Sequence, residues 1–428
     1  MQLERMNPWW NLKKVPSDWL GTKRIVLVSL LPFIPKRMAI LLHGVRRVGK
    51  STLMFQLVQH LIDEQVNPYD ILYFTFDESL INLEELLLVF EKEVLREPLQ
   101  SRKLFIFLDE IQKHPLWWDK IKLFYDLYPN IKWVLSGSNG LMLHKKMTES
   151  LAGRVFSFQI HPLTFPEYLS FHQIMWDKKH IEIQRATLEP YINHYLETSG
   201  FPELFNEKES QVIHQYFRET VENRIIFQDI PMLFKIEEPL LLQQLFKIIS
   251  SSPGMTVIYT HLASDLKRDW RTIESYLGYL EKSYLLRQLT VYSSNMLTSR
   301  KKLKKFYPTY SAFSFLQNST KEVDKNFLGH IVESVVVQVT NSQYYIQTPK
   351  QEEIDLLIQK NNMFYPVEVK YRNEITTGMI QKMANLIKKL NYPVGYMITQ
   401  TEKKTLHFDS VSIHLVPLFE FLLLGLES

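Results

Sequence analysis

The sequence of 428 residues contains no cysteine. Without thiols the protein cannot form disulfides, use a cysteine nucleophile or hold zinc through cysteine ligands. The absence also suits a reducing compartment, so we expect a cytoplasmic protein.

Long apolar runs are missing as well. The most apolar early segment, residues 25–42, is interrupted by two prolines, a lysine and an arginine, whereas a membrane-spanning helix needs about 20 consecutive apolar residues. No secretory signal is recognisable, because Glu4 and Arg5 come early and no apolar core leads to a cleavage site. We therefore expect no association with a membrane.

A strong net charge is also absent. The chain carries 50 basic and 46 acidic residues, a balance of +4 that does not by itself predict nucleic-acid binding, so any basic surface must be local. The apolar fraction of 45% and charged fraction of 22% are typical of globular proteins. No internal repeat is found, and the length allows two to four domains.

The clearest chemical signal is a glycine loop that follows the apolar segment 38–42 and precedes an amphipathic helix at residues 52–62. The loop fits the pattern GxxxxGK[ST], in which backbone N–H groups and a helix start bind phosphates. Lys50 would contact the β and γ phosphates, and the Ser51 hydroxyl would hold Mg²⁺. A glycine-rich turn without a ligand is the alternative. We expect ATP and Mg²⁺ as cofactors, with the nucleotide bound by Gly44, Val45, Arg46, Arg47, Val48, Gly49, Lys50, Ser51 and Thr52.

Two carboxylates follow a second apolar strand, predicted at residues 104–108. Asp109 would bind Mg²⁺, usually through water, and Glu110 would polarise the water that attacks the γ phosphate. After a later strand, Ser138 or Asn139 is expected to sense the γ phosphate. This combination predicts ATP hydrolysis rather than nucleotide storage.

The transferred phosphoryl group also calls for an arginine, supplied in cis or by a neighbouring subunit. Arg154 is the first candidate and Arg224 the second, although either can equally be a structural ion-pair partner. If Arg154 acts in trans, the protein must form a homo-oligomer such as a ring.

Alternating strands and helices over residues 36–163 predict an α/β core with a parallel sheet and helices on both faces. Residues 1–35 would form an arm anchored by Trp9 and Trp10, and residues 164–236 a helical lid. The strands of the core are predicted at residues 40–42, 71–76, 104–108, 133–136 and 155–160.

Residues 237–298 show three helices followed by a strand, which is the pattern of a winged helix. The third helix would bury Ile273, Leu277 and Leu280. It would contact DNA through Arg271, Thr272, Ser275 and Lys282. The basic run at residues 300–305 is either a solvated linker or a further phosphate contact through Arg300, Lys301 and Lys302. Such three-helix units also serve as protein contacts, which is the alternative.

The last segment, residues 299–428, predicts a compact α/β unit. Asp355 lies on one strand, and Glu368 and Lys370 alternate on the next. Two carboxylates can hold Mg²⁺ while an ammonium activates the hydrolytic water. The set resembles the site of PD-(D/E)xK nucleases, in which Glu333 on the preceding helix takes the place of a further acidic metal ligand. Many such domains have lost catalysis and only bind DNA.

The chain as a whole resembles prokaryotic AAA-type ATPases with an uncharacterised C-terminal domain. The resemblance implies an AAA+ core with a helical lid, a winged helix and a restriction-endonuclease-like domain. Near residue 305 this chain departs from it, since relatives tend to have an Asp after the Lys-x-Tyr segment. The motifs that carry the resemblance are residues 44–51, 108–112, 135–138, 151–154, 162–168 and 199–203.

Together these features predict an ATP-driven protein that processes DNA. Branched DNA is one candidate substrate, because a motor with a winged helix is similar to branch-migration motors and the last domain to junction resolvases. The alternative is a nucleotide switch in defence or regulation, whose C-terminal domain is a non-catalytic scaffold.

Overall fold

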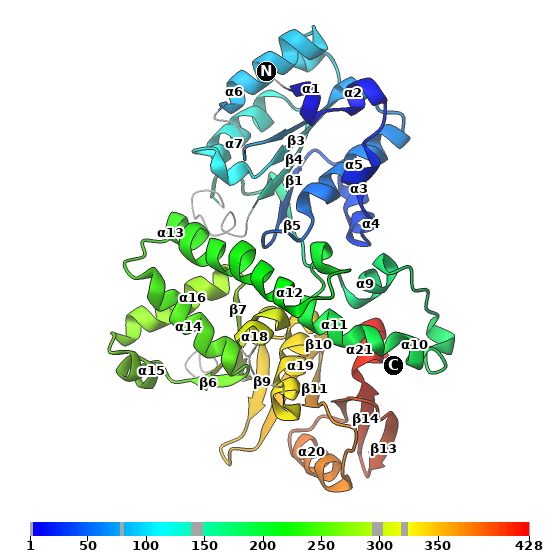
Figure 1. The fold of residues 1–428 in the computed structure, drawn as a ribbon, viewed down its shortest axis with the longest axis vertical. Coiled ribbons are helices and arrows are strands. Elements are labelled where there is room, and N and C mark those ends of the chain that lie inside the picture. Colours follow the sequence, from blue (N-terminus) through cyan, green and yellow to red (C-terminus); the bar gives the residue numbers. More distant parts are fainter. Residues whose placement is uncertain (1–2, 78–80, 138–148, 293–302, 318–323, 428) are drawn as a thin grey trace. The chain divides into compact units, whose positions relative to one another are not determined.

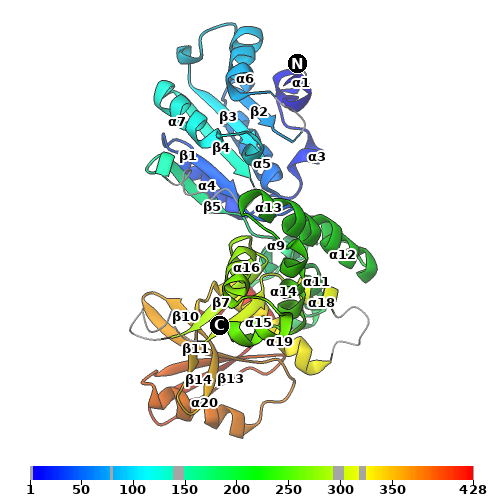
Figure 2. The same cartoon turned by 90° about the vertical axis from the view of Figure 1, so that its left-hand side faces the viewer.

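The computed structural model describes residues 3–77, 81–137, 149–292, 303–317 and 324–427. The chain forms two compact units, Met1–Pro162 and Leu163–Ser428, which are drawn in Figures 1 and 2. None of the helices in these described ranges is both long and apolar enough to cross a membrane. The predicted lid, residues 164–236, lies within the second of the two units.

The first unit is built on a five-stranded parallel sheet in the order β2-β3-β4-β1-β5. Its inner strands are buried along their whole length, as expected when helices cover both faces of a parallel sheet. All five predicted strands are confirmed. They are β1 (Ala39–His43), β2 (Ile71–Thr75), β3 (Leu104–Asp109), β4 (Ile131–Gly137) and β5 (Val155–Gln159).

Helices cover both faces of this sheet, with α5 on one side and α7 on the other in both views (Figures 1 and 2). The predicted loop helix is confirmed as α5, which begins at Lys50. The helices of the first unit are α1 (Leu3–Met6), α2 (Trp9–Leu12), α3 (Ser17–Leu20), α4 (Val26–Leu30), α5 (Lys50–Asp63), α6 (Leu83–Val89) and α7 (Trp117–Leu127).

The N-terminal arm is tied to strand β2. The indole Nε1 atoms of Trp9 and Trp10 donate to the carbonyl oxygen of Ile71 at 3.2 and 2.9 Å. The Asn7 amide donates to the Tyr73 carbonyl at 2.9 Å, and its oxygen accepts from the Tyr73 N–H at 2.6 Å. The two tryptophans are thus packing anchors, as predicted.

The second unit begins with helices that lead into a mixed sheet. One continuous helical stretch, residues 210–233, contains two π-helical segments, Phe217–Glu222 and Ile225–Asp229. The α-helices of the unit are α9 (Phe165–Phe171), α10 (Arg185–Leu188), α11 (Pro190–Thr198), α12 (Ser210–Tyr216), α13 (Ile230–Leu233), α14 (Pro239–Ser251), α15 (Tyr259–Leu266), α16 (Trp270–Lys282), α18 (Ser311–Gln317), α19 (Lys325–Thr340), α20 (Thr377–Lys389) and α21 (Leu418–Leu424).

The sheet of the second unit has nine strands in the order β13-β14-β12-β11-β10-β9-β7-β8-β6. Strand β7 pairs antiparallel with β8 and parallel with β9, so the hairpin of the predicted winged helix continues the sheet of the C-terminal segment. The predicted boundary between residues 298 and 299 falls inside this hairpin. The strands are β6 (Met255–Val257), β7 (Leu286–Val291), β8 (Lys304–Pro308), β9 (Tyr344–Gln347), β10 (Glu353–Lys360), β11 (Met363–Lys370), β12 (Val394–Thr399), β13 (Lys404–Phe408) and β14 (Val411–Pro417).

Two apolar cores lie on the two faces of this sheet. Alternate residues of one strand belong to different cores: on β10, Leu356 and Ile358 join the core with α19 and α21, whereas Leu357 joins the core with α20. Strands β13 and β14 and helix α21 complete the sheet and its cover, and we did not predict them.

Candidate functional sites

The glycine loop connects β1 to α5 at the carboxyl end of the parallel sheet. Gly44 must be glycine, because a Cβ at this position would lie 2.3 Å from the carbonyl oxygen of Ile160. Gly49 precedes α5 with φ of 87°, and Arg47 also has a positive φ of 65°. A non-glycine residue with a positive φ is uncommon and marks a strained backbone, as often found at binding loops.

Lys50 is buried at the start of α5, and its ammonium donates to the loop carbonyls of Gly44 and Val45 at 3.1 and 3.0 Å. A single lysine thus lies inside the loop that would surround the phosphates, as the prediction requires. His43, which ends β1, is neutral near pH 7, because burial, with smaller contributions from His161 and Lys50, lowers its pKa to about 4.

Asp109 ends β3 and lies beside the start of α5. One of its carboxylate oxygens accepts from the Ser51 hydroxyl at 2.5 Å and from the Tyr73 hydroxyl at 2.9 Å. The other accepts from the Ser136 hydroxyl and from the Glu110 N–H at 3.0 Å. The two predicted Mg²⁺ ligands, Ser51 and Asp109, are therefore side by side, and their oxygen donors suit that ion.

Glu110 is the next residue and has a positive φ of 50°. Its carboxylate accepts from the Gln112 amide. Burial raises the pKa of Glu110, an effect that the Lys50 ammonium partly offsets. A carboxylate with a raised pKa in a strained turn beside the phosphate loop is suited to accept a proton from water.

Arg154 lies at the opposite end of the sheet from the phosphate loop. It directly precedes β5, where Val155 pairs with Ala39 at the beginning of β1. A five-residue strand spans about 16 Å at about 3.3 Å per residue, so Arg154 cannot reach the loop of its own subunit. The prediction that Arg154 contacts the phosphates of its own subunit is therefore wrong, and a role in a neighbouring subunit or a structural role remains. Its guanidinium forms two hydrogen bonds of 3.1 Å to Asp126.

The remaining first-unit prediction concerns the γ-phosphate sensor. Ser138 and Asn139 lie outside the described residues. The neighbouring Ser136 bonds to Asp109, as described above.

Arg224, the second candidate for the arginine that contacts the transferred phosphoryl group, is exposed on the second unit.

A buried arginine that we did not predict supports the loop. The Arg24 guanidinium donates to the carbonyl oxygens of Val48, at 2.8 Å, and His161, at 3.0 Å. Gln56 on α5 accepts from the Arg24 N–H at 3.2 Å and donates to the Leu20 and Thr22 carbonyls at 2.7 and 2.9 Å. The arm thus links the glycine loop to the end of the first unit.

On the predicted third helix, α16, the packing prediction is confirmed. Ile273, Leu277 and Leu280 are buried, and Arg271, Ser275 and Lys282 are exposed, with Thr272 half-buried. Trp270 is also exposed, and the Arg271 guanidinium lies 5.0 Å from the centre of its ring. Arg300, Lys301 and Lys302 lie outside the described residues, whereas Lys305 at the end of the basic run is buried rather than solvated.

The C-terminal carboxylates are paired with lysines. Lys370 contacts Glu368 at 2.6 Å and Asp355 at 3.9 Å, and Asp355 also accepts from the Val369 N–H at 2.8 Å. Burial, together with the charges of Glu368 and Glu333, raises the pKa of Asp355 well above its usual range. The predicted proximity of Asp355, Glu368 and Lys370 is therefore present.

Glu333 on α19 lies in the same cluster but is bonded to strand β8. It accepts from the Tyr307 hydroxyl at 2.5 Å, and the Lys305 ammonium lies 3.9 Å away. Lys305 also donates to Glu353 on β10. Although burial alone would raise it, the pKa of Glu333 is lowered by His330, Lys305 and Tyr307.

A metal fits this cluster poorly. No group of three or more His, Asp and Glu side chains within the described ranges is arranged to hold a metal ion. The metal role of Glu333, Asp355 and Glu368 therefore stays a prediction that the observed pairing does not support. We missed Lys305, Tyr307 and Glu353, although the alternation in each strand places Lys305 beside Tyr307 and Glu353 beside Asp355.

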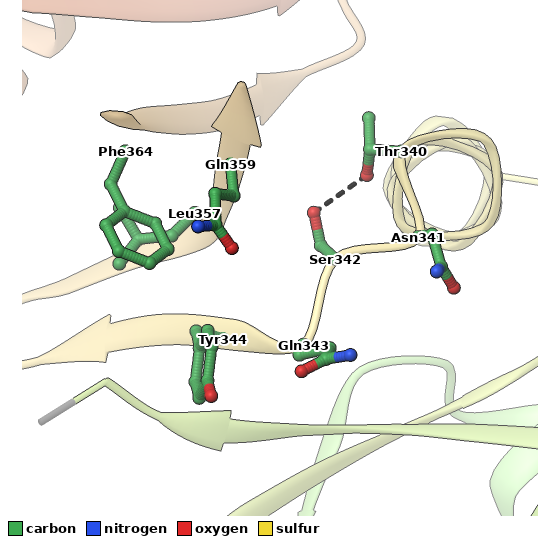
Figure 3. Close-up of a pocket in the computed structure, with 8 residues that line it drawn as sticks. All are labelled: Thr340, Asn341, Ser342, Gln343, Tyr344, Leu357, Gln359 and Phe364. Carbon is green, nitrogen blue, oxygen red and sulfur yellow. Dashed lines mark hydrogen bonds between the residues drawn. The ribbon is translucent and has the colours of Figure 1, made fainter. Parts of the chain in front are cut away.

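A separate pocket of about 240 Å³ lies where α19 meets the sheet (Figure 3). Thr340 and Ser342 share a hydrogen bond of 2.7 Å at its edge (Figure 3). No charged residue lines it. Its lining consists of Thr340, Asn341, Ser342, Gln343, Tyr344, Leu357, Gln359 and Phe364.

Comparisons with known proteins agree with the first site. Residues 36–169 match a family described as an AAA domain, and residues 189–311 and 328–421 match two domains of unknown function, DUF8612 and DUF4143. The uncharacterized protein MJ1544 of Methanocaldococcus jannaschii is 27% identical over 78% of this chain and 74% of its own length. The uncharacterized protein MJ1637 of the same organism is 28% identical over 70% and 67%.

An uncharacterized protein of Haemophilus influenzae is 22% identical over 81% of this chain and 85% of its own length. Among solved structures, AMPPCP-bound DnaA from Aquifex aeolicus is 12% identical and covers 60% of this chain and 86% of its own. With a TM-score of 0.28, this similarity is too low to support a shared fold or function. Residues 36–169 thus match an AAA domain, and the two segments that follow match domains of unknown function.

Proposed function

We propose that this protein hydrolyses ATP in its first unit and binds DNA through the segment from α14 to β8. The observation that carries the ATPase proposal is the 2.5 Å hydrogen bond between Ser51 and Asp109. It brings the end of β3 to the glycine loop, so the metal ligands and the base candidate Glu110 meet at one point.

In the proposed mechanism the residues of this chain have separate tasks. Bound Mg²⁺ would neutralise phosphate charge, and Ser51 and Asp109 would hold it. Lys50 would contact the β and γ phosphates, and Glu110 would accept a proton from the attacking water. Tyr73 and Ser136 would orient Asp109 through their hydrogen bonds to its carboxylate.

The DNA-binding proposal rests on the order of elements between residues 239 and 308. The order along the chain is α14, β6, α15, α16, β7 and β8. Strands β6 and β7 both pair with β8. This order supports a winged helix, with Arg271, Thr272, Ser275 and Lys282 on the open side of α16 as the DNA contacts.

ATP turnover in the presence of duplex, forked and four-way DNA tests the link between the two parts. We expect stimulation by DNA that is lost in the double variant Arg271→Ala/Lys282→Ala, with exposed Lys92→Ala as the control. Removing two phosphate contacts should also lower the salt dependence of binding by about two in log–log slope. Turnover that is the same with every DNA would exclude the coupling.

The second candidate is a nucleotide switch whose C-terminal part is a scaffold without catalysis. The pairing of Lys305 with Glu353 and Glu333 favours it over metal-dependent cleavage. Mg²⁺-dependent nicking by the parent and by Asp355→Ala distinguishes the two. Nicking lost in Asp355→Ala would restore the nuclease proposal.

A further inference from the structure

The carboxylate cluster of the second unit receives two side chains from strand β8, Lys305 and Tyr307. Strand β8, the last strand of the proposed winged helix, carries Lys305 and Tyr307 on one of its sides. Because β8 belongs to the same sheet as β10 and β11, these two side chains reach α19 and β10. Tyr307 bonds to Glu333, and Lys305 bonds to Glu353.

Lys305 is enclosed within this cluster. Its side chain is only 8% exposed, and its ammonium bonds to Glu353 and lies 3.9 Å from Glu333. A lysine so enclosed cannot contact a DNA phosphate. A buried ammonium needs carboxylates as counter-charges, and here it uses Glu353 and Glu333, of which Glu333 belongs to the predicted metal set.

The other carboxylates of the predicted metal set are also occupied. Lys370 contacts Glu368 at 2.6 Å and Asp355 at 3.9 Å. The cluster therefore contains two fixed ammonium groups among four carboxylates, Glu333, Glu353, Asp355 and Glu368. A divalent cation entering it would meet both ammonium charges at close range.

We infer that Lys305 is an internal counter-ion that takes the place of a divalent metal in this cluster and ties the β8 hairpin to α19 and β10. This cluster accordingly binds no catalytic metal. The inference is independent of ATP hydrolysis, which uses a different set of residues in the first unit.

Mn²⁺ binding to the full-length, metal-stripped protein without nucleotide tests the inference directly by electron paramagnetic resonance. The parent should show no Mn²⁺ site that depends on Asp355. Lys305→Met should gain one site, at least about tenfold tighter than any residual Asp355-dependent binding of Mn²⁺ by the parent, a change of about 1.4 kcal/mol. That site should disappear in Lys305→Met/Asp355→Asn.

Lys304→Met is the matched control, because Lys304 is the neighbouring residue on β8 and lies over the Tyr259 ring at 5.3 Å. It should gain no site. A Mn²⁺ site in the parent that Asp355→Asn removes would overturn the inference, even if Lys305→Met fails to fold. A folded Lys305→Met that gains no site would overturn the role given to Lys305.

Discussion

Replacing Arg24 with methionine should loosen the glycine loop and destabilise the first unit. Arg24 is buried, and its guanidinium donates to the Val48 carbonyl at 2.8 Å and the His161 carbonyl at 3.0 Å. A hydrogen bond with a charged partner contributes about 1.5 to 3 kcal/mol, so losing two should lower the free energy of unfolding by about 3 to 6 kcal/mol. Lys23→Met, on the exposed neighbouring residue, should change it by less than about 0.5 kcal/mol.

Urea unfolding followed by circular dichroism measures the stability change, and titration with a fluorescent ATP analogue measures the functional one. We expect weaker nucleotide binding in Arg24→Met under conditions in which the variant is still folded, because Val48 belongs to the loop that would bind the phosphates. Arg24→Lys can keep one of the two hydrogen bonds, so its stability and its nucleotide affinity should lie between those of the parent and those of Arg24→Met. Unchanged unfolding and unchanged nucleotide affinity in Arg24→Met would refute the role of the arm.

Three further predictions concern the first unit. Lys132→Met should lower the free energy of unfolding by about 4.5 kcal/mol or more, because the Lys132 ammonium donates to three backbone carbonyls at 2.5 to 2.7 Å, whereas exposed Lys122→Met should not. Burial lowers the pKa of His43 to about 4, so the unfolded state binds the extra proton, and His43 should lower the stability by about 2 kcal/mol as the pH drops from 7 to 5; the fall in stability should be smaller by that amount in His43→Gln. If Arg154 acts in trans, Arg154→Ala should lower ATP turnover without changing the nucleotide affinity, and parent turnover per subunit should fall on dilution; concentration-independent turnover would contradict this.

Much of the first unit could be predicted, because each of its strands is a short apolar run and its loop carries a spaced motif. The meeting of Ser51 with Asp109 follows from the strand order, since β3 and β1 are both parallel to β4 and end at the same edge. Arg24 could not be predicted, because its partners are backbone carbonyls, which leave no pattern in the sequence.

The C-terminal cluster shows where local patterns are insufficient. Alternation correctly brought Glu368 and Lys370 together beside Asp355. The position of Lys305 depends on β7, β8 and β9 lying in one sheet, which is a long-range pairing that no local pattern records. For the same reason the basic run that contains Lys305 predicts a solvated linker or a phosphate contact, although Lys305 itself is buried among carboxylates.

In the proposed function, Asp109 and Glu110 form a hydrolytic site with the glycine loop. The most direct test is single-turnover ATP hydrolysis by the parent, by Glu110→Gln and by the exposed control Glu93→Gln. We predict that Glu110→Gln still binds ATP but cleaves it at least about 100-fold more slowly, as expected when a general base is removed, while Glu93→Gln matches the parent. Equal cleavage rates in all three proteins would contradict the claim.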